Sequence, residues 1–260
     1  MDYNFISLTN IKCKYLDYNS TTPIDPRVLE AMLPFLKDNF ANPSSIHHFG
    51  QSINENVKQA REQIADFINA ASNELIFTCG ATEAINIAIK GAAESYSNKG
   101  THIITASTEH KAVIDTCKDL ERKGFEVTYL PVEPNGLINL VELEKAIRND
   151  TILVSVMYVN NETGVIQPIK EISKITHEKG ALFMTDVTQA VGKIEIDVND
   201  LGIDVLCFSG HKMYAPKGIG ALYVRQRGNK VKLTPQNHGG GHEQGLRSGT
   251  LNVPGIIALA

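Results

Sequence analysis

The sequence predicts an α/β protein with a mixed, mostly parallel β-sheet covered by helices on both faces. Short runs rich in valine and isoleucine alternate along the chain with stretches whose apolar residues repeat at helical spacing, an order typical of βαβ units. Strands in such units are buried on both faces of the sheet. The last two runs are separated by too few residues for a helical crossover, so we expect that pair to be antiparallel.

Each element follows from its local pattern. The runs expected to form the largely parallel part of the sheet are Glu74–Thr78, His102–Thr105, Glu126–Leu130, Ile152–Tyr158 and Leu182–Thr185. Helical periodicity predicts the connecting helices at Ala81–Ser95, His110–Arg122, Leu140–Ile147 and Ile169–His177. The antiparallel pair is Val205–Phe208 with Ala221–Val224. A last helix should open near Pro254, because proline fits the first turn of a helix.

Composition excludes several classes of function. The chain is 42% hydrophobic and 21% charged, which are ordinary values for a soluble globular protein. Its 260 residues suffice for one large domain. The net charge is −4 without a basic block, so no nucleic-acid partner is expected. No apolar run could span a membrane, and the first residues lack the apolar core of a secretory signal, so a cytoplasmic location is expected. Four widely spaced cysteines without a C-x-x-C pair fit reduced thiols rather than disulfides or a metal site.

Polar residues stand directly after the predicted strands, where ligands of parallel α/β sheets bind. Lys212 follows one strand, and Asp186 follows another, where its partly buried carboxylate would need a partner. Gly80 precedes a helix that opens at Ala81, and free N–H groups at such a helix start suit a phosphate. His110 begins the next helix. Taken singly, each has a simpler explanation, as a solvated charge, a helix cap or a turn.

One ligand uses all of these residue types together, and that ligand is pyridoxal 5'-phosphate. Its aldehyde needs a lysine amine, and its pyridine nitrogen needs a carboxylate to stay protonated. Its phosphate needs a helix N-terminus and hydroxyl groups, and its ring needs a flat group such as imidazole on one face. The sequence therefore predicts a pyridoxal-phosphate site.

Nine short motifs then resemble, in order, the cysteine desulfurases of the iron–sulfur cluster assembly branch, within the class V aminotransferase group of fold type I enzymes. They are Tyr15-Leu16-Asp17, Thr21-Thr22-Pro23, Asn42-Pro43-Ser44-Ser45, Gly80-Ala81-Thr82-Glu83, Thr108-Glu109-His110-Lys111, Val159-Asn160-Asn161-Glu162, Asp186 with Gln189, Ser209-Gly210-His211-Lys212, and Arg247-Ser248-Gly249-Thr250. The resemblance runs from Tyr15 to Ala260. It implies that residues 16–260 form the large cofactor-binding domain, truncated at its end. Residues 1–15 would pack on a small C-terminal domain that this chain lacks.

The resemblance also implies roles for single residues. Lys212 would bind the cofactor covalently and later move the Cα proton of the substrate, and His110 would lie over the ring and assist. Asp186 would pair with the pyridinium nitrogen, and no metal is implied. The other implied cofactor-binding residues are Ala81, Thr82, Asn161, Gln189, Ser209, His211 and Thr250. In the family Thr250 reaches the phosphate of the other subunit, so a homodimer is implied.

The implied activity is the conversion of L-cysteine to L-alanine, with the sulfur passed through an enzyme persulfide to an acceptor or scaffold protein of iron–sulfur assembly. The nucleophilic cysteine and the substrate-carboxylate arginine of the family are expected beyond residue 260, so the chain alone is expected to be inactive. Cys117 should be a core residue, and Cys79 and Cys207 are expected to be small buried residues before tight turns.

Several alternatives stay open from sequence alone. Another pyridoxal-phosphate reaction is possible, namely selenocysteine lysis, cysteine-sulfinate desulfination or transamination, as is a noncatalytic cofactor-binding scaffold. His238-Gly239-Gly240-Gly241-His242 resembles the oxyanion loop of esterases, but the chain has no G-x-S-x-G elbow. The same two histidines have the spacing of zinc ligands on a helix, but the three glycines between them make a helix improbable.

Overall fold

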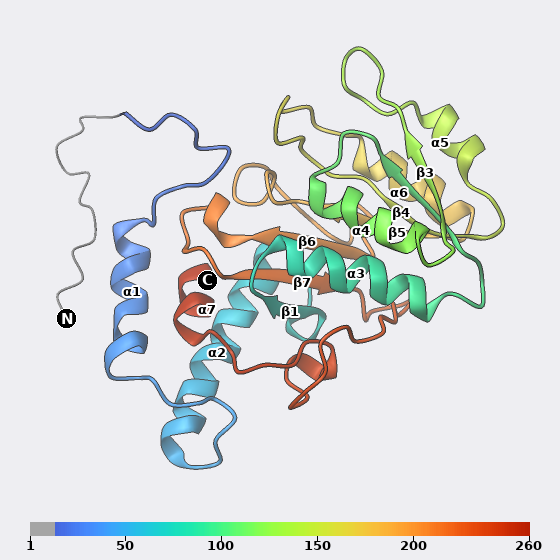
Figure 1. Cartoon of the computed structure of the whole chain (residues 1–260). Coiled ribbons are helices and arrows are strands. Elements are labelled where there is room, and N and C mark those ends of the chain that lie inside the picture. The colour runs from blue at the N-terminus through green and yellow to red at the C-terminus, as the bar shows by residue number, and fades with distance from the viewer. Residues whose placement is uncertain (1–13) are drawn as a thin grey trace.

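The computed structural model describes residues 14–260, which form a seven-stranded sheet between two layers of helices (Figure 1). The strands are β1 (Leu75–Thr78), β2 (His102–Ala106), β3 (Glu126–Leu130), β4 (Thr151–Ser155), β5 (Leu182–Asp186), β6 (Val205–Ser209) and β7 (Gly220–Val224). Their order in the sheet is β1-β7-β6-β5-β4-β2-β3. Strand β7 is antiparallel to β6 and to β1, and the other neighbouring pairs are parallel. The expected mixed, mostly parallel sheet is confirmed.

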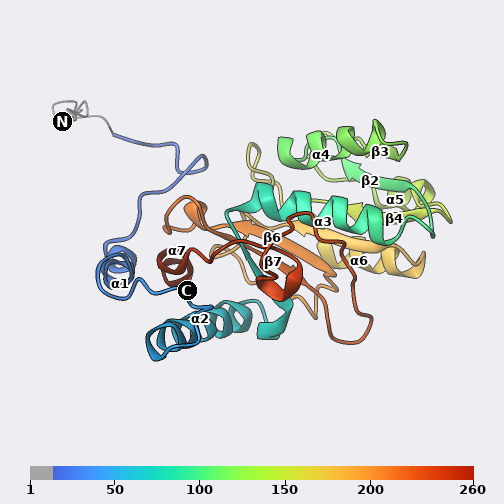
Figure 2. The same ribbon diagram turned by 60° about the horizontal axis from the view of Figure 1, so that its bottom comes forward.

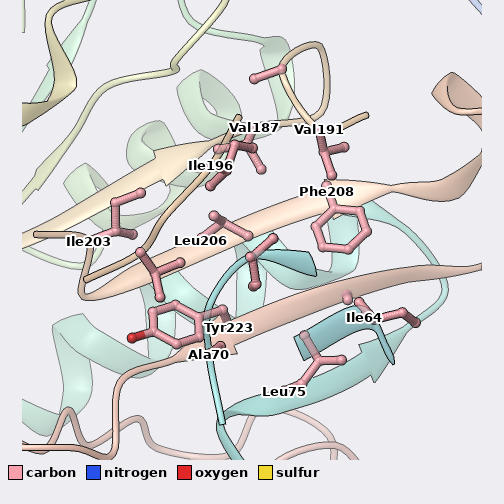
Figure 3. Close-up of a cluster of buried hydrophobic side chains, with 14 of the residues drawn as sticks. Ile64, Ala70, Leu75, Val187, Val191, Ile196, Ile203, Leu206, Phe208 and Tyr223 are labelled. Carbon is pink, nitrogen blue, oxygen red and sulfur yellow. The ribbon is translucent and has the colours of Figure 1, made fainter. Parts of the chain in front are cut away.

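Helices cover both faces of this sheet (Figure 2). They are α2 (His48–Phe67), α3 (Ala81–Ser95), α4 (Lys111–Glu121), α5 (Leu140–Ala146), α6 (Ile169–Glu178) and α7 (Val253–Leu259), whereas α1 (Pro26–Lys37) packs on α7 rather than on the sheet. One face packs against α3 and α4, where Ile85, Ile89 and Val113 are completely buried. The other face packs against α2, α5, α6 and α7. This second core places Phe208 and Tyr223 of the antiparallel strands close to Ile64 of α2 (Figure 3).

The structure corrects the sequence analysis at three places. Helices α1 and α2 were not predicted, although Asp25 and His47 cap their N-termini by accepting hydrogen bonds from Arg27 N and Gly50 N. Strand β4 ends at Ser155 rather than at Tyr158. Its pairing with β2 ends there, while the next residues still donate backbone hydrogen bonds to β5. The segment 1–15 is described only from residue 14, so the expectation for residues 1–13, including Cys13, lies outside the described residues.

Two glycines bring β7 against the turn that follows β1. A Cβ atom on Gly220 would lie 2.7 Å from Gly80 Cα and 2.5 Å from the carbonyl oxygen of Phe208. Gly80 itself has φ of 152°, which L side chains rarely adopt. Glycine at both positions therefore lets the start of α3 approach the ends of β6 and β7, which brings the two halves of the site together.

Candidate functional site

A cavity of about 690 Å³ lies beyond the carboxyl ends of β1, β5 and β6. Nine of the ten residues that the sequence analysis assigned to the cofactor line this cavity, namely Ala81, Thr82, His110, Asn161, Asp186, Gln189, Ser209, His211 and Lys212. Thr250 is exposed and is not among the lining residues. Because parallel strands end at one edge of the sheet, residues far apart in the chain meet here.

Asp186 is the last residue of β5 and is only 4% exposed. Its Oδ1 atom accepts a hydrogen bond of 2.8 Å from the backbone N–H of Thr188. Burial raises the pKa of Asp186, whereas Thr188, His110 and Lys212 act to lower it. A buried carboxyl that lines a cavity is a strong site for a cation, because a cationic ligand would favour its ionised form.

Lys212 ends the short 3₁₀ helix η2 (Gly210–Lys212) that follows β6 directly. Its Nζ atom donates a hydrogen bond to the carbonyl oxygen of Asn19. Burial and the neighbouring Lys193 lower the pKa of Lys212, with the acids Asp17 and Asp186 opposing the shift. A lysine amine with a lowered pKa is a better nucleophile for a carbonyl group near neutral pH.

Gln189 belongs to the same hydrogen-bond network. Its Nε2 atom donates to the Asn19 carbonyl at 2.9 Å, and its Oε1 atom accepts from Lys193 Nζ at 2.7 Å. The sequence analysis gave no role to Asn19 or Lys193. Asn19 lies between two motifs that it did single out, and Lys193 stands four residues after Gln189, a spacing that could have suggested the contact.

The part of the cavity formed by the start of α3 and by His211 is suited to a phosphate. Ala81 and Thr82 are the first residues of α3, a helix of 15 residues whose N-terminal N–H groups attract anions. The Nδ1 atom of His211 lies 3.1 Å from the Oγ1 atom of Thr21. Burial, Lys212 and Lys217 lower the pKa of His211. His211 is therefore neutral at physiological pH and contributes a hydrogen-bonding ring rather than a charge.

His110 and Asn161 enter the cavity from two different loops. His110 caps α4, since its Nδ1 atom accepts a hydrogen bond of 3.1 Å from the backbone N–H of Ala112. In the neutral ring this places the proton on Nε2. Asn161 is partly buried, and its Nδ2 atom donates to Glu162 Oε1 at 2.8 Å.

The described cysteines differ in exposure, which corrects one expectation. Cys117 and Cys207 are completely buried, and burial raises the pKa of Cys117 to about 12 and that of Cys207 well above its ordinary value. Cys79, expected to be buried, is exposed and lines the cavity. The reason is that the buried part of β1 ends at Thr78, and the next residue already belongs to the turn. Burial and the neighbouring Glu83 raise the pKa of Cys79 as well.

The residues present fit pyridoxal phosphate. An amine, a buried carboxyl, an imidazole and a helix N-terminus surround one cavity, and these are the groups that the aldehyde, ring nitrogen, ring face and phosphate require. The Oγ1 atom of Thr188, another lining residue, is buried without a hydrogen-bond partner, so a polar group of a ligand could satisfy it. Among residues 14–260, no cluster of histidine, cysteine and acidic side chains is arranged to hold a metal ion.

Comparisons with known proteins agree on one family. The family model described as aminotransferase class-V matches residues 14–260. Two curated relatives, both named cysteine desulfurase IscS, come from Pectobacterium carotovorum and Rickettsia massiliae. Both are 56% identical to this chain over 94% of its length. The matched regions cover 61% and 60% of the lengths of the two relatives. The chain thus spans about 60% of the curated relatives that it matches.

Solved structures share the fold over nearly the whole chain. A structure titled SspA in complex with cysteine is 48% identical, with a TM-score of 0.91 over 95% of this chain and 71% of that one. A structure of DndA from Streptomyces lividans is 42% identical, with a TM-score of 0.84 over 95% of this chain and 70% of that one. None of the helices in residues 14–260 is long and apolar enough to cross a membrane.

Proposed function

The chain belongs to the class-V aminotransferase family, and from this premise we propose that the protein is a pyridoxal-phosphate-dependent cysteine desulfurase. The observation that carries the proposal is the placement of buried Asp186 and the low-pKa amine of Lys212 in one cavity. The names of the curated relatives support the choice of reaction.

Pyridoxal phosphate is the cofactor of this family, and when bound it supplies an electron sink that stabilises negative charge at the Cα atom of an amino acid. Lys212 would hold the cofactor aldehyde and, once displaced by substrate, move the Cα proton. Asp186 would keep the ring nitrogen protonated, because a buried carboxylate favours a neighbouring cation. His110 would cover one ring face and assist proton transfer through Nε2.

The remaining residues of the cavity would orient the cofactor. Gln189 and Asn161 would bind the ring edge that carries the phenolic oxygen. The phosphate would be held by Ala81, Thr82, Ser209 and His211. Thr250 is exposed and does not line the cavity of its own subunit. It would reach the phosphate bound in a second subunit, and this arrangement requires a homodimer.

The sulfur-transfer step would convert L-cysteine and an enzyme thiol into L-alanine and an enzyme persulfide. The Cβ–S bond of the substrate breaks and the S–S bond forms, with protons completing the methyl group of alanine. Cys117 and Cys207 are unsuited to accept this sulfur, since both are buried with raised thiol pKa values. Cys79 is exposed at the cavity, but burial and Glu83 raise its thiol pKa as well. The resemblance to the family therefore leads us to propose that the acceptor thiol and the substrate-carboxylate arginine lie past residue 260, in the part of the relatives' length that this chain does not span. The persulfide would serve an acceptor or scaffold protein of iron–sulfur assembly in the cytoplasm.

The test has two parts. The protein purified with pyridoxal phosphate should show a visible absorption band that borohydride removes, with the reduced cofactor attached to Lys212 in peptide mapping. Because the chain spans only about 60% of its relatives, we expect the 260-residue chain alone to release no sulfide or alanine from L-cysteine. An extended protein that also contains the remaining part of that length should release both in the presence of a reductant. Attachment at another lysine would refute the site, and release of selenide or sulfite from the corresponding analogues, without turnover of cysteine, would favour one of the related reactions.

A further inference from the structure

Glu109 is a buried carboxyl that the proposed chemistry leaves unused. The residue is 8% exposed and precedes His110 in the turn between β2 and α4. Its Oε1 atom accepts a hydrogen bond of 2.6 Å from the backbone N–H of Met157. Its Oε2 atom is buried without a hydrogen-bond partner. An ionised carboxylate with one oxygen left unpaired in an apolar environment would be costly.

Among residues 14–260, no cation is found to counter the raised pKa of Glu109. Burial and the negative charge of Asp186 on β5 raise the pKa of Glu109 well above its ordinary value, and only the Met157 N–H opposes them. Titratable groups that face it from α4 and β6 are the thiols of Cys117 and Cys207, and their pKa values are raised in turn by Glu109. These groups are neutral or acidic, so they favour an uncharged Glu109.

The polar character of this region extends into the sheet. Thr105 of β2 and Ser155 of β4 are neighbours in register, and the hydroxyl of each is buried without a partner. Ser155 lies two residues before Met157, which donates to Glu109.

Two hydrogen bonds join the turn of Glu109 to the segment after β4. One is the bond from Met157 N to Glu109 Oε1 at 2.6 Å, and the other runs from Asn160 Nδ2 to the carbonyl oxygen of Thr108 at 2.9 Å. The turn carries His110, and the segment after β4 continues into Asn161. The two bonds therefore set the distance between side chains that enter the cavity from separate loops.

We propose that Glu109 is a positioning residue that stays uncharged, ties the turn bearing His110 to the segment after β4, and leaves the charge beside the cofactor ring to Asp186. The inference rests on the proposed function. Its physical reason is that a second negative charge close to Asp186 would favour protonation of Asp186 and weaken its pairing with the ring nitrogen. A misplaced His110 would also lose much of its effect, since small displacements of positioned groups are costly in catalysis.

The charge state can be tested without any turnover. Infrared difference spectra of the full chain, wild type minus Glu109→Gln at neutral pH, should contain the carbonyl band of a protonated carboxyl group. The matched control is Glu62→Gln, the same change at an exposed position of α2, and its difference spectrum should lack the carbonyl band of a protonated carboxyl group. Carboxylate bands for Glu109 would overturn the proposal.

The positioning role needs a second comparison. Glu109→Gln keeps an oxygen that accepts from Met157 N–H, whereas Glu109→Ala removes it. In the cofactor-free protein, hydrogen exchange at the Met157 amide should be slow in wild type and Glu109→Gln and at least ~10-fold faster in Glu109→Ala. In the extended protein with cofactor and cysteine, Glu109→Ala should lose ~10- to 10²-fold in kcat with a smaller change in KM, and Glu109→Gln should restore most of that loss.

The outcomes separate this inference from the proposed function. Equal losses in Glu109→Gln and Glu109→Ala would show that the negative charge matters, and unchanged exchange at Met157 in Glu109→Ala would show that the tie does not position the loop. Either result contradicts the inference. A wild-type protein without a cofactor band would contradict the proposed function, while the infrared and exchange results would still decide the state and the contact of Glu109.

Discussion

Burial moves single side chains in the cavity and beside it toward their uncharged forms. It raises the pKa values of Asp186 and Glu109 and lowers those of Lys212 and His211. Such shifts gather at functional sites because catalytic groups must change protonation near neutral pH. The two acids differ in access, since Asp186 lines the cavity and Glu109 does not.

The Asp186→Asn variant tests the first of these acids. An amide cannot stabilise a protonated ring nitrogen as a carboxylate does, so in the extended protein desulfuration of cysteine should fall at least ~10²-fold, the scale of one preorganised electrostatic contact. Lys212 should still hold the cofactor, as shown by borohydride labelling. Asp115→Asn, at an exposed site on α4, is the matched control, and turnover equal to that control would remove Asp186 from the mechanism.

Glu109 should also leave a signature in stability against pH. Its pKa in the folded protein lies well above the ordinary 4.5, so the folded state keeps its proton where the unfolded state releases it. The free energy of unfolding contributed by Glu109 is therefore fully present below about pH 4.5 and is lost as pH rises through the folded pKa. Compared with wild type, Glu109→Gln should gain in Tm as pH increases from about 5 to 8. A Tm difference that stays constant over this range would argue against the buried neutral acid.

At the scale of elements, short contacts between chain segments shape the site. The loop before α7 is held by Glu243, whose side chain is 2% exposed and forms a bidentate pair with Arg61 of α2 at 2.6 and 2.8 Å. Glu243 Oε2 also accepts a 2.6 Å bond from Phe77 N on β1. Glu243 and Gln244 both have positive φ, 49° and 59°, a conformation that this anchoring must hold in place. The same loop continues into the motif that ends at Thr250.

Gly220→Ala tests the contact between β7 and the turn after β1. The added Cβ would lie 2.5 and 2.7 Å from backbone atoms of Phe208 and Gly80, so the turn must move. We expect a loss of about 1–3 kcal/mol in stability, typical of overpacking, and weaker binding of pyridoxal phosphate measured by titration. Gly228→Ala is the control, since its Cβ would meet nothing within 4 Å and only its φ of 67° is unfavourable. Cofactor affinity equal to that control would show that the close approach does not shape the phosphate site.

At the scale of the whole molecule, Thr250 is the predicted site residue that its own cavity does not include. Its exposed position agrees with a role in a second subunit, where a two-fold axis would exchange the two loops. The site would then be complete only in the dimer.

Mixing two impaired variants of the extended protein tests this arrangement. Lys212→Ala subunits keep Thr250, and Thr250→Ala subunits keep Lys212, so a mixed dimer contains one complete site. After unfolding and refolding together at equal amounts, activity should recover to roughly a quarter of wild type, because about half of the dimers are mixed and each has one working site. The separately refolded variants are the control. No recovery in a mixture that contains mixed dimers would place Thr250 in its own subunit.

Much of the fold and of the site could be predicted from local sequence. Apolar runs of four to seven residues separated by helical periodicity predicted the seven strands and the mixed sheet, because burial on both faces requires such runs. Lys212, Asp186 and the start of α3 could be selected because each lies at or shortly after the end of a predicted strand. Helices α1 and α2 were not predicted. Only caps and amphipathic spacing mark them, and the prediction for that part of the chain rested on its motifs.

The sequence by itself determined which residue types stand at the strand ends, and hence the class of cofactor. Only the tertiary structure decided which of them meet and in what state. It placed β7 between β1 and β6, brought the Asn19 carbonyl to Lys212 and Gln189, exposed Cys79 and buried Glu109 beside Asp186. The physical reason is that strand order, burial and electrostatic coupling depend on contacts between residues distant in the chain, and local patterns do not record those contacts.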